Sequence, residues 1–302
     1  MVETFRTEPL NMEFVVKNIV DGIAKYIEDN HLKCCVIGLS GGIDSTVCAA
    51  LCKMAKVPLI GVSLPCHTNE AEEKSTAKLA GEEFCDAFKE VNLEYLFTAT
   101  KNFCDHSVSE KESTPISQGN IKARLRMITL YDIASKSQGI VLDTDNLTEN
   151  FLGFWTLKGD EGDFNPIGGL WKHEVYDLAR YLKEHHFKDS KALEASIALI
   201  PTDGNGVKEG GDLAQIAPGK TYNDVDEILD RWVGLDKRVK EIVIKNYFDY
   251  GVFKELCEKH GYETVEAVIM RSVRSEFKRK QRPFIIDIHR GYICEKNGNI
   301  II

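Results

Sequence analysis

The chain has 302 residues, of which 43% are hydrophobic and 28% are charged, as expected for a globular protein with a sizeable core. Its net charge of −9 disfavours nucleic-acid binding, because phosphate recognition needs a basic surface. We find no apolar run long enough to cross a bilayer and no secretory segment after Met1, so we expect no membrane partner.

The cysteines and the length of the chain indicate its cellular compartment and its number of domains. The nine cysteines are odd in number and include no CxxC spacing, which is typical of reduced, mostly buried thiols in a cytoplasmic protein. A chain of this length fits one decorated α/β domain over residues 1–302.

The first part of the chain alternates between helical and strand patterns. Residues 12–30 predict an amphipathic helix, and the apolar run 34–39 (CCVIGL) predicts a strand buried on both faces. A loop rich in glycine and serine follows, before a helical stretch at 47–56. The remaining elements of this part are predicted strands at 58–64, 86–91 and 139–142, and predicted helices at 70–83 and 118–137.

This alternation is the pattern of a parallel sheet with helices on both faces. The helix 118–137 has apolar residues on nearly opposite sides, which predicts burial on both sides, centrally or at a subunit interface. Asn297-Gly298 predicts a C-terminal hairpin. Between the sheet and this hairpin, helices are predicted at 172–186, 223–232, 236–247 and 264–275.

The segment 38–45 (GLSGGIDS) lies at the carboxyl end of a predicted strand, where sheets of this kind bind ligands. Gly41 and Gly42 let a phosphate approach the main chain, and the N–H groups at a helix start face the anion. Asp44 would repel a bare phosphate, so it indicates Mg²⁺ between carboxylate and phosphate. No Walker lysine follows the glycines. The alternative is an ordinary strand-to-helix turn with an N-cap.

The motif SGGIDS (40–45) resembles the signature of the ATP pyrophosphatases, which cleave ATP between the α- and β-phosphates. Later segments resemble those of NAD synthetases and occur in the same order. They are QGNIKARLRM (118–127), Thr144 with Glu149, GFWT and GDEGDFNP (153–166), Lys172, PTD (201–203) and TYNDVD (221–226). The resemblance implies a Rossmann-like, adenine nucleotide alpha hydrolase-like α/β fold with C-terminal helices and a short hairpin.

The resemblance also implies roles for individual residues. The catalytic residues would be Asp44 and Lys172, and the Mg²⁺ ligands would be Asp44 and Glu149. The implied ATP-binding residues are Gly38, Leu39, Ser40, Gly41, Gly42, Ile43, Asp44, Ser45, Thr144, Lys172 and Thr202. The implied contacts to the dinucleotide substrate are Arg124, Lys158, Asp163, Phe277 and Lys278.

The chain departs from the family pattern at several places, one of which is the segment 202–220, where the match is poor beyond its start. Leu157 stands where the family often has a substrate-contacting lysine, and Lys158 is one residue late. Phe277 replaces the usual histidine before Lys278, and Asp143 stands where a glycine commonly precedes the threonine. These departures concern the substrate contacts more than the ATP chemistry.

The reaction implied is that of a carbon–nitrogen ligase. ATP would adenylate the carboxylate of deamido-NAD (nicotinic acid adenine dinucleotide), with release of pyrophosphate. Ammonia would then displace AMP to give NAD. The Gly-rich segments 154–169 and 202–220, predicted to lack regular structure, would exclude water as lids. Neither end has room for a glutaminase domain, so free ammonia is the expected donor, with ammonia from a separate glutaminase partner as the open alternative. The resemblance also implies a homodimer.

Other interpretations remain open. A second adenylating enzyme of the superfamily, such as a tRNA-modifying one, is disfavoured by the acidic charge. A regulatory module that keeps the loop without catalysis is disfavoured by the presence of both Asp44 and Glu149. Individually, Arg124 could be a solvated helix charge, Asp163 a loop cap, and Lys278 part of a solvated basic run.

Overall fold

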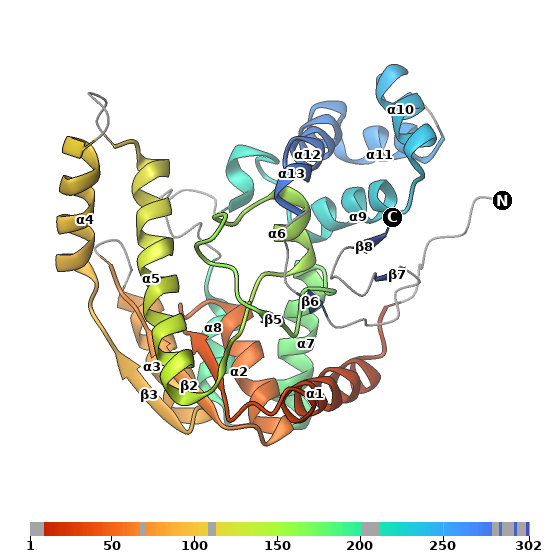
Figure 1. The fold of residues 1–302 in the computed structure, drawn as a ribbon. Helices are drawn as coiled ribbons and strands as arrows, with labels where there is room; N and C mark the ends of the chain where they lie inside the picture. The colour runs from red at the N-terminus through yellow and green to blue at the C-terminus, as the bar shows by residue number, and fades with distance from the viewer. Residues whose placement is uncertain are drawn as a thin grey trace.

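The computed structural model describes residues 9–66, 71–107, 113–200, 212–249 and 251–279, and the backbone of three short strands beyond them. A four-stranded sheet in the order β3-β2-β1-β4 lies at the base of the molecule (Figure 1). All of its strand pairs are parallel. The strands are β1 (Cys35–Gly38), β2 (Leu59–Ser63), β3 (Ala87–Glu90) and β4 (Ile140–Val141).

Helices cover both faces of this sheet, as the alternating pattern predicts. Along β1, Cys35 and Ile37 face one core cluster while Val36 faces another, because successive side chains of a strand point to opposite faces. Helices α4 (Glu94–Ser107) and α5 (Pro115–Ser137) cover the face of Val36. The opposite face is packed by α1 (Met12–Asp29), α2 (Ile43–Ala55), α3 (Ala71–Phe84), α7 (Lys172–His185) and α8 (Lys191–Ala198).

A second core forms among helices that come after the sheet in the chain. Leu147, Trp171, Ile228 and Val268 are among its buried members, so it reaches from α6 and the start of α7 to the C-terminal helices. The C-terminal helices of this core lie at the upper right of Figure 1. The elements that follow the sheet are α6 (Leu147–Leu152), α9 (Tyr222–Val233), α10 (Lys237–Lys245), α11 (Val252–His260), α12 (Tyr262–Arg274) and α13 (Glu276–Arg279), with the 3-10 helix η1 (Asp212–Gln215).

Short strands complete the description. β5 (Phe164–Asn165) pairs in parallel with β6 (Phe284–Ile285), and Leu142 bridges to Phe164. β7 (Ile293–Cys294) and β8 (Ile300–Ile301) pair antiparallel, which agrees with the predicted C-terminal hairpin, although its turn lies outside the described residues. None of the helices in the described residues is both long and apolar enough to cross a membrane.

One predicted helix boundary was wrong, and several helices were not predicted. Helix α2 begins at Ile43, so the end of the predicted loop is the first helical turn. In α5, Ile128 is 59% exposed, so its side of the helix is not covered within one chain, and burial at a subunit interface stays a prediction. The sequence did not predict α4, α6, α8, α11 and α13, of which α6 and α13 are too short to show a helical period.

Candidate active site

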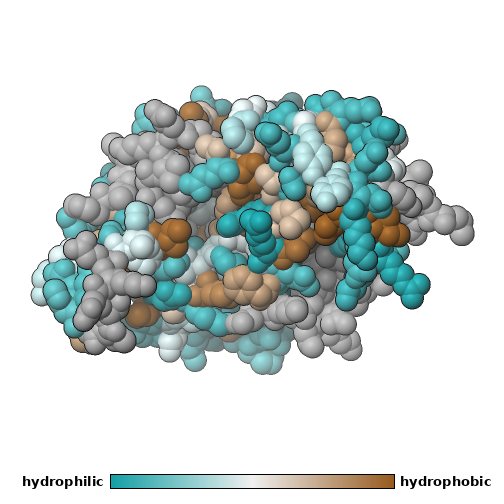
Figure 2. All heavy atoms as spheres, turned by 90° about the horizontal axis from the view of Figure 1, so that it is seen from above, coloured by the Kyte–Doolittle hydropathy of each residue, from teal (hydrophilic) through white to brown (hydrophobic). Residues whose placement is uncertain are grey.

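A cavity of about 670 Å³ opens at the carboxyl edge of the parallel sheet. The ends of β1, β2 and β4 all contribute to its lining, as expected for the carboxyl ends of parallel strands. Helix α5, the start of α7 and the segment 153–161 supply the other walls. Viewed from above, hydrophilic and hydrophobic residues lie side by side on this face of the molecule (Figure 2).

The loop between β1 and α2 needs glycine and brings a helix start to the cavity. Gly41 has φ +90°, and a Cβ there would lie 2.1 Å from the carbonyl oxygen of Glu73, so only glycine fits without rearrangement. Gly42 is the N-cap of α2 and provides no side-chain cap for its first N–H groups. Ser40 Oγ accepts from Gly42 N at 3.1 Å and lies 3.2 Å from Ser45 Oγ. This leaves the positive end of the α2 dipole beside the cavity.

The predicted catalytic and metal-binding residues meet at this loop. Lys172 Nζ lies 2.5 Å from Asp44 Oδ2 and 3.0 Å from Glu149 Oε1. Burial acts to lower the pKa of Lys172, but the charges of Asp44 and Glu149 outweigh it and hold that pKa well above its usual value. The site therefore contains one permanent ammonium between two carboxylates, contributed by α2, α6 and α7.

This carboxylate pair fits the ligand requirements of Mg²⁺. Mg²⁺ in nucleotide sites is typically held by one or two carboxylates, with phosphate oxygens and water completing the octahedron. Asp44 and Glu149 line the same cavity beside the loop 38–45. Within the described ranges no cluster of three His, Cys, Asp or Glu residues is arranged to hold a metal ion.

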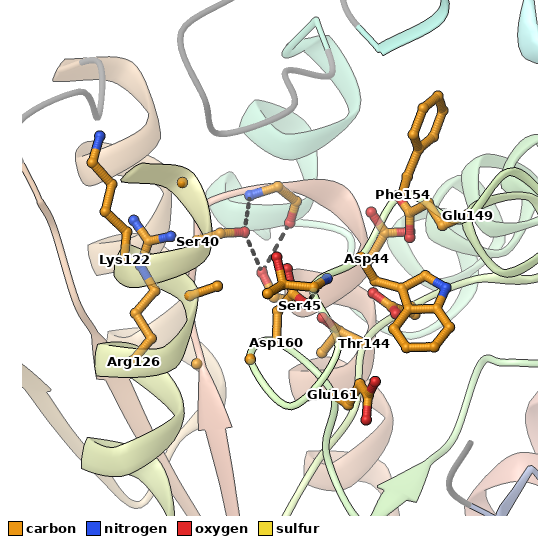
Figure 3. A pocket seen from close by; sticks show the side chains of 18 of the residues that line it. Ser40, Asp44, Ser45, Lys122, Arg126, Thr144, Glu149, Phe154, Asp160 and Glu161 are labelled. Carbon is orange, nitrogen blue, oxygen red and sulfur yellow. Dashed lines mark hydrogen bonds between the residues drawn. The ribbon is translucent and has the colours of Figure 1, made fainter. Parts of the chain in front are cut away.

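Two cations lie across the cavity, of which Lys122 was not singled out from the sequence. Lys122 and Arg126 project from α5 on the side opposite Asp44 and Glu149 (Figure 3). Burial lowers the pKa of both side chains, and Lys122 lies 5.2 Å over the ring of Phe97. Their i,i+4 spacing, which places them on one helix face, is the sequence signal that could have identified them.

The residues predicted to contact the dinucleotide are dispersed. Lys278 lines the main cavity, where its Nζ donates to the carbonyl oxygens of Gly153 (2.8 Å) and Trp155. Arg124 is exposed, donates to Leu157 O at 3.1 Å, and lines a smaller neighbouring cavity between α4 and α5.

The other three predicted substrate contacts lie outside both linings. Lys158 is exposed with φ 55°, and Phe277 is 59% exposed. Asp163 accepts a hydrogen bond from the Tyr131 hydroxyl at 2.8 Å. Two further residues, Thr144 and Thr202, were predicted to bind ATP from outside the loop 38–45. Thr144 lines the main cavity, whereas Thr202 lies outside the described residues.

Comparisons with known proteins identify the family of the chain. A family model described as NAD synthase matches residues 15–282. An NH(3)-dependent NAD(+) synthetase from Wolinella succinogenes is 31% identical over 275 residues, which cover 90% of this chain and 95% of that protein. Another from Fusobacterium nucleatum is 29% identical over 286 residues, which cover 92% and 99%.

Solved structures show the same fold. An NH3-dependent NAD synthetase from Campylobacter jejuni superposes with a TM-score of 0.59 at 25% identity, covering 85% of this chain and 96% of that one. An NMN synthetase from Francisella tularensis superposes with a TM-score of 0.71 at 24% identity, covering 90% and 98%. With the family model matching most of its length, this chain belongs to the NAD synthase family, as its motifs predicted.

Proposed function

We propose that the chain catalyses ATP-dependent amidation of deamido-NAD to NAD with ammonia as the nitrogen donor. The observation that carries this proposal is the meeting of the loop 38–45, Asp44, Glu149 and Lys172 in one cavity of an NAD synthase family member. The products would be NAD, AMP and pyrophosphate, formed through an adenylated substrate.

The chemistry explains why these groups are needed. A carboxylate does not react with ammonia until one of its oxygens becomes part of a good leaving group, and attack on the ATP α-phosphate achieves this. Because no covalent enzyme intermediate is required, the protein must mainly position the reactants and neutralise charge. Mg²⁺ bound at Asp44 and Glu149 would neutralise charge on the pyrophosphate when present. The loop N–H groups and the Lys172 ammonium would hold the phosphates in line.

The cations of α5 and α13 are well placed for the rest of the substrates. Lys122 and Arg126 face the phosphate loop from across the cavity, so they would bind anionic phosphates at its other side. Lys278 lies at the cavity wall next to Trp155. We propose substrate contacts for Arg124, Lys158, Asp163 and Phe277 on family resemblance, and an ATP contact for Thr202 on the same ground.

We also propose that residues 1–302 act as one catalytic unit within a cytoplasmic homodimer. The first point is supported by α6 and α7, which carry Glu149 and Lys172 and link the two core clusters. We propose dimerisation on family resemblance, with the exposed Ile116 and Ile128 of α5 as candidate contacts. The eight cysteines whose side chains the structure describes are free thiols, and free thiols are typical of cytoplasmic proteins.

The test is to incubate the protein with ATP, Mg²⁺, ammonium and deamido-NAD and to quantify products by chromatography. NAD, AMP and pyrophosphate should form in equal amounts. Failure of all three at saturating ammonium would contradict the proposal, and ADP would indicate a different phosphoryl chemistry. Faster turnover of nicotinic acid mononucleotide would reassign the substrate, a relevant comparison because Leu157 replaces the family lysine.

The matched variant is Asp44→Asn, which keeps the size and polarity of the side chain but removes a carboxylate charge. We expect it to fold normally and to lose at least about a hundredfold in turnover, since it removes charge from the phosphate and metal site. Circular dichroism checks the fold and the product assay checks turnover. Near-normal turnover of this variant would remove the proposed metal role of Asp44.

A further inference from the structure

We infer that Asn146 is a positioning residue that directs the carboxylates of Asp44 and Glu149 toward a single cation position. This inference deepens the proposed function and rests on it, because it concerns how the proposed metal-binding carboxylates are held. Asn146 itself is fully buried, at 0% exposed, immediately before α6.

Asn146 engages one oxygen of each carboxylate. Its side-chain Nδ2 donates to Asp44 Oδ1 at 2.9 Å, although the two residues are 102 positions apart in the chain. Its backbone N–H donates to Glu149 Oε2 at 3.1 Å. Its Oδ1 accepts from the backbone N–H of Glu149 at 3.0 Å, which completes a capping box at the start of α6.

The second oxygen of each carboxylate then faces the same point. Asp44 Oδ2 and Glu149 Oε1 lie 2.5 and 3.0 Å from Lys172 Nζ, so one ammonium contacts both. Rotation of either carboxylate away from this arrangement would break its bond to Asn146. Asn146 therefore fixes the angle at which both carboxylates present an oxygen to the Lys172 ammonium, and it would hold the same two oxygens for a metal ion bound beside it.

Capping alone does not account for an asparagine here. An N-cap requires only a side-chain oxygen, and Ser190 and Thr221 provide one for α8 and α9. The amide donor of Asn146 is not used in the cap; it is directed to Asp44. Serine at this position would keep the cap but would be too short to reach the Asp44 carboxylate, and this difference separates the two roles.

The experiment measures Mn²⁺ binding by electron paramagnetic resonance in the presence of α,β-methylene-ATP, an analogue that cannot be cleaved between those phosphates. The variants are Asn146→Ser, which keeps the cap, and Asn146→Ala, which loses it. Asn11→Ser is the matched control, since Asn11 caps α1 through the same kind of bond to Phe14 N.

If Asn146 orients the carboxylates, both of its variants should weaken Mn²⁺ binding by a similar factor of about 10- to 100-fold, as for other residues that orient metal ligands. Asn11→Ser should bind Mn²⁺ like the wild type. A normal Kd in Asn146→Ser together with a weakened one in Asn146→Ala would overturn the inference, because only the cap would then matter.

The same measurement separates this inference from the proposed function. Wild-type protein that forms NAD while Asn146→Ser binds Mn²⁺ normally would refute only the role of Asn146. Wild-type protein that forms no NAD would refute the proposed reaction, whereas a selective loss of Mn²⁺ affinity in both Asn146 variants would still support the positioning role.

Discussion

The ammonium of Lys172 lies in an almost closed environment, with its side chain 3% exposed and those of Asp44 and Glu149 each 14% exposed. The two buried carboxylates depend on the cation that they share, because the desolvated charges have little water to screen them. The same residues thus serve both the integrity of the cavity and its proposed phosphate chemistry.

Replacing Lys172 by methionine should therefore destabilise the protein substantially. It would leave two carboxylates without their shared cation, and removing one partner of a buried ion pair typically lowers the free energy of unfolding by about 3–5 kcal/mol. Urea unfolding followed by circular dichroism measures the change. The control is Lys183→Met on the same helix. Lys183 forms an ion pair with Glu194, and their side chains are 29% and 70% exposed, so this pair should contribute less than about 1 kcal/mol to stability. Equal small losses in both variants would contradict a structural role for the buried pair.

At the scale of elements, the start of α7 determines where Lys172 lies. Its first N–H groups are capped by side chains: Trp171 N donates to Glu174 Oε2 and Lys172 N to Thr148 Oγ1. His173 N donates to Asp226 Oδ2, and the other oxygen of Asp226 accepts from Thr148 Oγ1. Asp226, fully buried on α9, thus holds α6 and α7 in register.

Asp226→Asn should lower the free energy of unfolding by about 1.5–3 kcal/mol, since an amide offers one acceptor where the carboxylate offers two charged ones. Chemical denaturation provides the measurement. Asp236→Asn is the control, because Asp236 is an exposed N-cap of α10 and asparagine caps equally well. A loss below about 0.5 kcal/mol in Asp226→Asn would mean that the buried network contributes little.

The start of α9 should make stability depend on pH. Hydrogen bonds from Thr221, first from its backbone N–H, lower the pKa of Asp224, and His260 adds to this from α11. A carboxyl group with a depressed folded-state pKa stabilises the protein above its unfolded pKa, near 3.8. That contribution is lost as the pH falls through the lower folded value. Urea unfolding between pH 6 and pH 3 should show a steeper loss in the wild type than in Asp224→Asn, and parallel curves would contradict this.

At the scale of the whole molecule, the exposed apolar residues of α5 provide a test of the proposed dimer. Ile128→Asp places a charge on the face that is proposed to be buried between subunits, so it should shift the protein toward monomer. Light scattering coupled to size exclusion measures the mass. Ile242→Asp on α10, where the isoleucine is 39% exposed, is the matched control and should leave the mass unchanged. A monomeric wild type would exclude the proposed assembly.

Local patterns in the sequence determined much of this fold. Short apolar runs predicted β1, β2 and β4 because a strand covered on both faces must be apolar throughout. The motif 40–45 located the loop of the cavity, and resemblance identified Asp44, Glu149 and Lys172. Helix α4 was missed because Tyr95 and Phe103 are exposed, so its apolar residues do not follow one face.

Tertiary structure alone decided how these residues act together. Lys172 contacts Asp44 across 128 positions of the chain, and Asn146 contacts it across 102, so no local period links them. They meet because parallel strands bring their carboxyl ends to one edge of the sheet, while the capped starts of α6 and α7 point at the same place. The sequence by itself thus determined the type of chemistry, and packing determined which oxygen, ammonium and amide share the site.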